Sequence, residues 1–135
     1  MLKILVVEDN EMNRDIVARR LSGIGYSLVV ANDGERGYVL AQEERPDLIV
    51  MDLALPGMDG LEVTRLLRSN EQTRAIPIIL LTAHASLDTR AEAFAAGCND
   101  YAVKPMAFSK LCEHIERLLV RRDESPLTAS PSPLE

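Results

Sequence analysis

The sequence contains little of what several classes of protein require. Its 135 residues include two cysteines, Cys98 and Cys112, whose spacing does not match a metal site. The formal net charge is -6, with no basic stripe of the kind that binds nucleic acid. No apolar run approaches the roughly 20 residues of a membrane span. These absences argue against a zinc-bound fold, a nucleic-acid-binding protein and a membrane-spanning protein.

The remaining composition favours one ordinary globular domain. Hydrophobic residues make up 47% and charged residues 27% of the chain, which is enough apolar material for one core. The N-terminus leads straight into a short apolar run without a small-residue cleavage site, so it does not match a signal peptide. With two free thiols that we expect to be mostly buried, the chain is predicted to be cytoplasmic.

Short apolar runs alternate with helical patterns along the chain. Runs such as KILVV and LIVMD are continuous and rich in β-branched residues, which is typical of strands buried on both faces. Between the runs, apolar residues recur at helical spacing and predict amphipathic helices, the first containing Met12, Ile16, Val17, Leu21 and Ile24. We expect strands at 3–7, 27–31, 48–52, 76–82 and 101–104, and helices that begin after Asn10, after Asp33, near Leu61, near Asp88 and at Phe108.

Glycine, proline and serine mark the expected ends of elements. Gly23 and Gly25 are expected to end the first helix, and Gly97 suits a left-handed cap on the fourth. The C-terminal stretch is rich in proline and serine and has little to bury. We therefore predict a folded domain at 1–122 and a disordered tail at 123–135.

Strands that alternate with helices predict a parallel sheet covered on both faces, and right-handed crossovers make it a doubly wound α/β fold. Ligands of such folds bind beyond the carboxyl ends of the strands. The first strand is followed by Glu8 and Asp9, the third ends on Asp52, the fourth on Thr82 and the fifth on Lys104. These polar residues are therefore predicted to share one edge of the sheet.

Three carboxylates at one edge repel one another unless a cation lies among them. A hard divalent cation, Mg²⁺ (or Mn²⁺), suits oxygen ligands and commonly also binds phosphate oxygens. Thr82 and Lys104 would then hold phosphoryl oxygens, and Asp52 is the candidate nucleophile for an aspartyl-phosphate. Each residue alone has a plain structural explanation, such as a helix N-terminus, a turn, a strand end or a solvated charge. Their shared place at strand ends favours the site.

At these positions the sequence resembles the CheY-like receiver domains of response regulators, the phosphoacceptor modules of two-component signal transduction. The motifs are VVEDN, MDLALPGMDG, LLTAHA and DYAVKP, and the resemblance covers about residues 3–120. It implies a flavodoxin-like sheet of five parallel strands in the order 2-1-3-4-5, with five helices. Within MDLALPGMDG, Asp52 is the implied phosphoacceptor, whereas Asp59 is better explained as a turn or helix-cap residue.

The resemblance implies a role for each residue of the site. Asp52 would accept a phosphoryl group from a phosphohistidine of a histidine kinase or a histidine phosphotransfer protein. The implied metal ligands are Asp9 and Asp52 directly, Glu8 through water and the backbone carbonyl of Ala54. The groups implied to hold the phosphoryl oxygens are the Thr82 hydroxyl, the Ala83 amide and the Lys104 ammonium. The bond before Pro105 would be cis.

A conformational switch is also implied. When phosphate draws Thr82 inward, Tyr101 would rotate into the space left behind and reshape the face formed by helix 4, strand 5 and helix 5, which would bind a downstream protein. In the relatives the first helix docks a four-helix phosphotransfer partner. Here the residues expected on its exposed side are Asn13, Arg14 and Val17. His84 either tunes the lifetime of the acyl-phosphate, together with Ala54, or has no role, and His114 is expected at the surface.

We expect a signalling module, monomeric or weakly dimeric, that binds neither nucleic acid nor membrane and catalyses only its own phosphorylation and dephosphorylation. The position of Met1 just before the first strand favours a stand-alone response regulator. The alternative is a receiver domain of a hybrid histidine kinase or a phosphorelay intermediate. An aspartyl-phosphate hydrolase would carry a second acid at Ala54, and a flavin carrier would carry a Gly-rich loop where EDNEMN is acidic.

Overall fold

The computed structural model describes residues 2–83, 86–104 and 107–123. Residues 121–123 are described by their backbone alone. Three expectations depend on residues outside these ranges: the role of His84, the cis bond before Pro105 and the disordered tail, of which 124–135 are not described. The division into a domain and a tail therefore stays a prediction. Among the described residues, no helix is both long and apolar enough to cross a bilayer.

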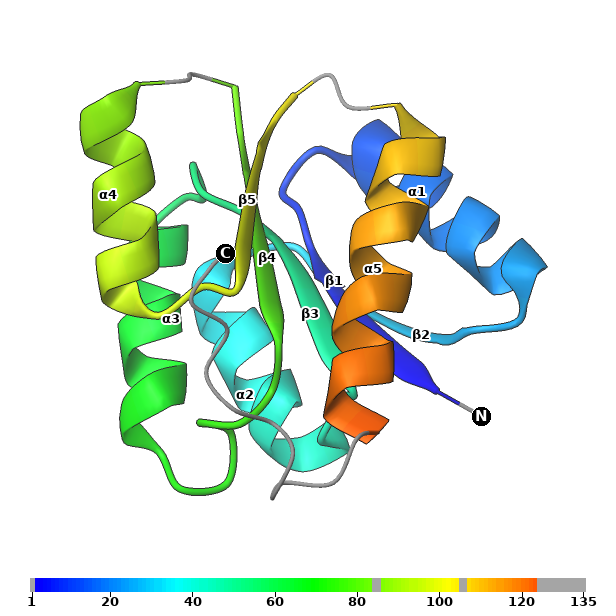
Figure 1. The fold of residues 1–135 in the computed structure, drawn as a ribbon, viewed down its shortest axis with the longest axis horizontal. Coiled ribbons are helices and arrows are strands. Elements are labelled where there is room, and N and C mark those ends of the chain that lie inside the picture. Colours follow the sequence, from blue (N-terminus) through cyan, green and yellow to red (C-terminus); the bar gives the residue numbers. More distant parts are fainter. Residues whose placement is uncertain (1, 84–85, 105–106, 124–135) are drawn as a thin grey trace.

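Five parallel strands form one sheet in the order β2-β1-β3-β4-β5, which confirms the predicted doubly wound fold (Figure 1). Every residue of the central strand β3 is buried, as its continuous apolar run predicts. The strands are β1 (Lys3–Val7), β2 (Ser27–Ala31), β3 (Leu48–Asp52), β4 (Ile78–Thr82) and β5 (Asp100–Val103).

Helices cover both faces of the sheet (Figure 1). One face carries α1 (Glu11–Ile24) and α5 (Phe108–Asp123), and the other carries α2 (Gly34–Glu44), α3 (Gly60–Ser69) and α4 (Leu87–Ala96). Alternate residues of β1 enter separate core clusters, Ile4 and Val6 on the α1–α5 side and Leu5 and Val7 on the other. The two-residue period of a strand thus divides one apolar run between two cores.

The helix ends follow the predicted capping residues with one correction. The backbone of Gly25 has φ 117° and that of Gly97 has φ 118°, so these two glycines end α1 and α4 in the left-handed conformation. Gly23 was wrongly expected to help end α1, because it continues the helix and only the position after Ile24 needs a positive φ. Asp59 caps α3, and its capping box with Glu62 confirms that this acid is structural.

Two strands and one helix differ in detail from expectation. β4 begins at Ile78 rather than at 76, and β5 spans Asp100–Val103 rather than 101–104. The helical period of α1 is correct, yet its burial is not the expected stripe: Leu21 is buried, whereas Met12 is 71% and Ile16 48% exposed. The apolar residues at the start of α1 therefore form a surface instead of core.

Candidate phosphoacceptor and metal site

The register of the sheet brings the predicted residues to one edge. Val7 of β1 pairs with Met51 of β3, so Glu8 and Asp52 follow side by side. Thr82 at the end of β4 pairs with Val103 of β5, which places Lys104 next along that edge. The carboxyl edge of four neighbouring strands thus holds Glu8, Asp9, Asp52, Thr82 and Lys104 together.

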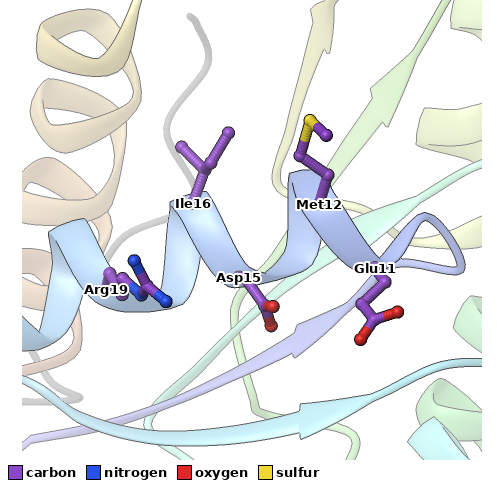
Figure 2. A pocket seen from close by; sticks show the side chains of 5 residues that line it. All are labelled: Glu11, Met12, Asp15, Ile16 and Arg19. Atoms are coloured by element: carbon purple, nitrogen blue, oxygen red, sulfur yellow. The ribbon is translucent and has the colours of Figure 1, made fainter.

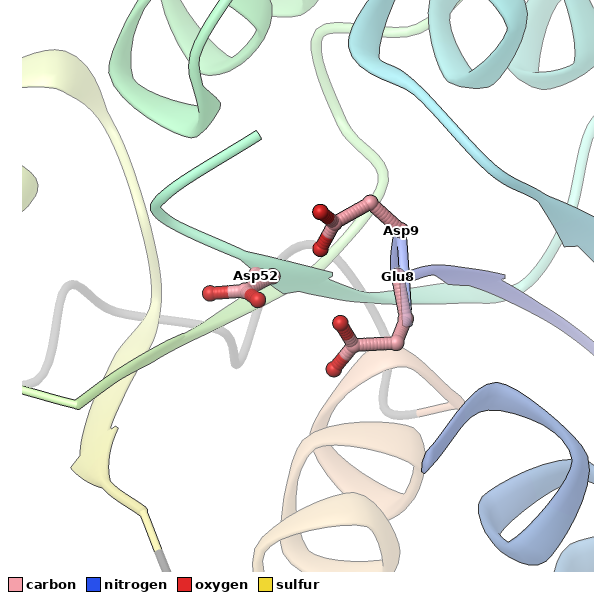
Figure 3. Close-up of side chains that lie close together, drawn as sticks. All are labelled: Glu8, Asp9 and Asp52. Carbon is pink, nitrogen blue, oxygen red and sulfur yellow. The ribbon is translucent and has the colours of Figure 1, made fainter. Parts of the chain in front are cut away.

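Three carboxylates converge at this edge from two strand ends (Figure 3). Glu8, Asp9 and Asp52 each offer an oxygen atom, and these oxygens lie within 4.8 Å of one another. Glu8 is 8% and Asp52 6% exposed, while Asp9 is exposed to solvent. The predicted acidic cluster is therefore present, with one acid open to the solvent.

Lys104 neutralises part of this negative charge. Its Nζ lies 2.9 Å from Asp52 Oδ2 and 3.3 Å from Glu8 Oε1. Burial by itself lowers the pKa of Lys104, but the hydrogen bonds and charges of Asp52 and Glu8 outweigh it, so the pKa is raised. The ammonium group therefore stays charged and holds the two buried acids.

The pKa of Glu8 is raised above its ordinary value. Burial is the largest cause that raises it, and the charge of Asp52 raises it further, against the opposing effects of the Asn10 amide and Lys104. Carboxylate oxygens arranged in this way fit a hard divalent cation such as Mg²⁺. The donor set therefore suits the metal that the sequence predicts.

The loop after β1 is held by several hydrogen bonds. The Glu8 amide donates to the Ala31 carbonyl at 3.1 Å, and the Asn10 amide donates to Glu8 Oε2 at 3.1 Å. Nη1 of Arg14 donates to the Glu8 carbonyl at 3.2 Å. Asn13, Arg14 and Val17 were expected on the exposed side of α1. Asn13 is exposed, whereas Arg14 and Val17 are partly buried, Arg14 because its side chain turns toward the acidic loop.

The loop after β3 fixes Asp52 from the other side. The Ala54 amide donates to Asp52 Oδ1 at 3.2 Å, and the Leu53 amide donates to the Leu81 carbonyl at 2.7 Å. Gly60 packs against this loop so closely that a Cβ would lie 2.7 Å from the Asp52 carbonyl oxygen. A side chain at Gly60 would therefore displace the backbone of the candidate phosphoacceptor.

The residues predicted to hold the phosphoryl group and to switch lie at the ends of β4 and β5. Thr82 is buried, its carbonyl accepts from the Lys104 amide at 2.6 Å, and Ala83 is exposed beside it. Tyr101 is 8% exposed and its ring lies 6.5 Å from that of Phe94. Tyr101 is thus already packed inside in this structure, and its rotation stays a prediction.

A groove between α1 and α5 adjoins the site. It is lined by Glu8 and Lys104 at the edge of the sheet and by apolar residues that include Ile16, Val17 and Phe108. The guanidinium of Arg20 lies 5.1 Å from the centre of the Phe108 ring. Sequence reasoning missed Arg20 and Phe108, and no sequence pattern relates two residues that only the packing of α1 on α5 brings together.

A second hollow lies on the outward side of α1 (Figure 2). Its lining residues are Glu11, Met12, Asp15, Ile16 and Arg19.

His114 on α5 was expected at the surface, but its ring is partly buried and contacts Asp100, which Arg117 also binds at 2.7 Å. That histidine therefore joins a local cluster with Asp100 of β5 and Arg117 of α5.

A doubly wound sheet whose carboxyl edge carries three acids, a threonine and a lysine defines the receiver class of signalling domain. The family model for the response regulator receiver domain matches residues 4–116, and the chain belongs to that family. It is a receiver domain of two-component systems.

Curated relatives that the chain matches are longer proteins. The chain is 41% identical over 118 residues to the transcriptional regulatory protein HprR of Escherichia coli, covering 87% of this chain and 52% of that protein. It is 36% identical over 132 residues to the DNA-binding dual master transcriptional regulator RpaA of Synechocystis, covering 98% and 55%. The chain thus spans about half the length of the curated relatives it matches.

Solved structures of receiver domains match over nearly their whole length. Chemotaxis protein CheY4 of Vibrio cholerae has a TM-score of 0.83 at 32% identity, covering 87% of this chain and 98% of that one. The receiver domain of sensor histidine kinase PA1611 of Pseudomonas aeruginosa has a TM-score of 0.82 at 37% identity, covering 88% and 98%. That domain was solved with a magnesium ion in its active-site cleft.

Proposed function

We propose that Asp52 accepts a phosphoryl group from a phosphohistidine, so that the domain relays a signal from a histidine kinase or a histidine phosphotransfer protein. The observation that carries the proposal is the buried Asp52 carboxylate at the end of β3, bonded to Lys104 and adjacent to Glu8 and Asp9. In the transfer, a bond forms between an Asp52 carboxylate oxygen and phosphorus while the bond from phosphorus to the histidine nitrogen breaks. The released imidazole takes up a proton.

Each residue of the site then has a role in the transfer. Glu8, Asp9, Asp52 and the Ala54 carbonyl would hold Mg²⁺ (or Mn²⁺), which supplies charge neutralisation for the phosphoryl oxygens when it is bound. Lys104 releases Asp52 and moves to a phosphoryl oxygen, where its point charge stabilises the transferred group. Thr82 and the Ala83 amide donate to the remaining oxygens. The domain catalyses only this transfer and the later hydrolysis of its own aspartyl-phosphate.

The groove between α1 and α5 supports a docking position for the phosphodonor. Apolar side chains of Ile16, Val17 and Phe108 line it, and Glu8 and Lys104 reach its wall, so a helix seated there would present its histidine close to Asp52. The exposed Met12 extends the same apolar surface.

Phosphorylation would then alter the α4–β5–α5 face, where Leu87 is 85% and Val103 39% exposed. This face would bind the downstream protein.

The wider protein is a separate question. The HprR and RpaA similarities favour a response regulator, and the similarity to the PA1611 receiver domain favours the alternative of a hybrid kinase or phosphorelay receiver. Phosphotransfer to a purified histidine phosphotransfer protein distinguishes them, because a phosphorelay receiver passes its group on and a terminal regulator does not.

The first prediction concerns Asp52→Asn. Incubation with acetyl phosphate and Mg²⁺ should raise the intact mass of the wild-type chain by one phosphoryl group, and Asp52→Asn should abolish the rise because its amide cannot form the acyl-phosphate. Asp59→Asn is the matched control, since Asp59 is an acid of the same loop that caps α3. A phosphoryl group retained by Asp52→Asn would refute the assignment.

A further inference from the structure

The metal site depends on how one exposed acid is oriented. Glu8 and Asp52 are buried and bonded to Lys104, whereas Asp9 is exposed at the turn between β1 and α1. An exposed carboxylate samples several rotamers, and a mobile backbone widens the range of positions that its oxygens reach. The residues that fix the peptide units on either side of Asp9 therefore control whether its oxygen stays near the other two.

Arg14 contacts both sides of Asp9. Nη1 of its guanidinium donates to the carbonyl of Glu8 at 3.2 Å, and its backbone amide donates to the carbonyl of Asn10 at 2.9 Å. The guanidinium thus holds the peptide between Glu8 and Asp9, whereas the amide makes the first i→i−4 hydrogen bond of α1, which any residue at this position would make. The Arg14 side chain is partly buried, while its neighbours Asn13 and Asp15 are exposed.

We infer that Arg14 is a positioning residue for the metal site: its guanidinium fixes the peptide between Glu8 and Asp9 and so orients the Asp9 carboxylate for a divalent cation. This inference rests on the proposed function, since it assigns a role at the same site. The guanidinium binds a neutral carbonyl, so it acts by geometry rather than by neutralising an acid.

Charge and geometry predict opposite effects when Arg14 is removed. A cation near the site repels Mg²⁺, so if Arg14 acted by charge alone, its loss would strengthen Mg²⁺ binding. If Arg14 acts by geometry, its loss frees the peptide between Glu8 and Asp9 and weakens Mg²⁺ binding. The sign of the change in the dissociation constant therefore separates the two roles.

The experiment is a titration of the full chain with MgCl₂, followed by NMR of the backbone amides. Arg14→Met should weaken Mg²⁺ binding roughly three- to tenfold, the range that the net contribution of one ordinary, partly exposed hydrogen bond gives. In the metal-free protein the amide resonance of Asp9 should also shift. Arg14→Lys, which keeps the charge and loses the planar fork, should restore part of the affinity.

The control and the adverse outcomes are defined by the same titration. Arg19→Met removes a cation from an exposed position of the same helix and should leave the dissociation constant within about twofold, as expected of a weakly coupled surface charge. Unchanged or tighter Mg²⁺ binding by Arg14→Met overturns the inference. If Arg14→Met does not fold, Arg14→Lys decides alone: affinity equal to that of the wild type overturns the inference, and weaker binding supports it. Failure of the wild-type chain to bind Mg²⁺ would instead refute the proposed function.

Discussion

The carboxyl edge and the amino edge of the sheet each contain a cation that contacts several oxygen atoms, but the oxygens differ in charge. At the carboxyl edge, Lys104 meets the carboxylates of Asp52 and Glu8, and Asp9 adds a third acid. At the amino edge, the guanidinium of Arg68 donates to the Gly97, Arg74 and Ile76 carbonyls and to the side chain of Asn99, at 2.7–3.0 Å.

The difference distinguishes a candidate cation-binding site from a structural hydrogen-bond network. The neutral acceptors of Arg68 need no further partner, and they tie α3 to the segments that precede β4 and β5. The acids around Lys104 remain in excess, so burial and repulsion raise the pKa of Glu8. Charge imbalance at one edge and fully paired neutral acceptors at the other distinguish the edge proposed to bind a cation from the edge that stabilises the fold.

The largest expected effect on stability comes from removing the Arg68 hydrogen bonds at the amino edge. Arg68→Ala leaves several partly buried acceptors unpaired and should lower the free energy of unfolding by about 2–4 kcal/mol. Urea denaturation measures this loss, while the affinity for Mg²⁺ should stay the same. Arg65→Ala, an exposed arginine on the same helix, should have little effect. Equal stability of the two variants would remove the contrast between the edges.

A smaller effect is expected at the unbalanced edge. Lys104→Met removes the ammonium that competes with a metal for Asp52 and Glu8, so Mg²⁺ should bind about fivefold more tightly, which corresponds to roughly 1 kcal/mol. An MgCl₂ titration followed by NMR measures the change, with the exposed Lys110→Met as the charge control. Weaker binding by Lys104→Met would show that the lysine helps to build the metal site instead of competing for it.

The smallest effect concerns pH. The pKa of Glu8 in the fold lies above its ordinary value of 4.5, so the folded protein binds more protons than the unfolded chain. Stability of the metal-free protein should therefore fall as the pH rises from that value through the raised pKa. Glu8→Gln should remove this fall, so its gain in stability over the wild type should be larger at about pH 7 than at about pH 5.

Urea denaturation in EDTA at the two pH values tests this effect. Glu11→Gln, which changes an exposed glutamate on α1, should keep the pH dependence of the wild type. A Glu8→Gln variant with the same pH dependence as the wild type would mean that repulsion at the carboxyl edge is already relieved by Lys104.

The strands and the polar residues at their carboxyl ends were predictable because both follow from local signals, whereas the strand order came from the resemblance to receiver domains. A continuous apolar run that ends in an acid, as at Asp52, identifies a buried strand and its carboxyl end from neighbouring residues alone. The packing of the helices on the sheet does not follow from local signals. The side of α1 that faces the sheet depends on α5, so Met12 emerged exposed and Arg14 turned inward, against expectation. The Arg68 network was invisible because most of its acceptors are backbone carbonyls, which carry no sequence pattern.

Every residue of β3 is buried, and the strand is paired on both sides, with β1 and with β4. Amides in such a strand exchange with solvent only when the whole domain opens. The candidate phosphoacceptor is therefore carried by a strand whose amides are expected to be among the most protected of the domain.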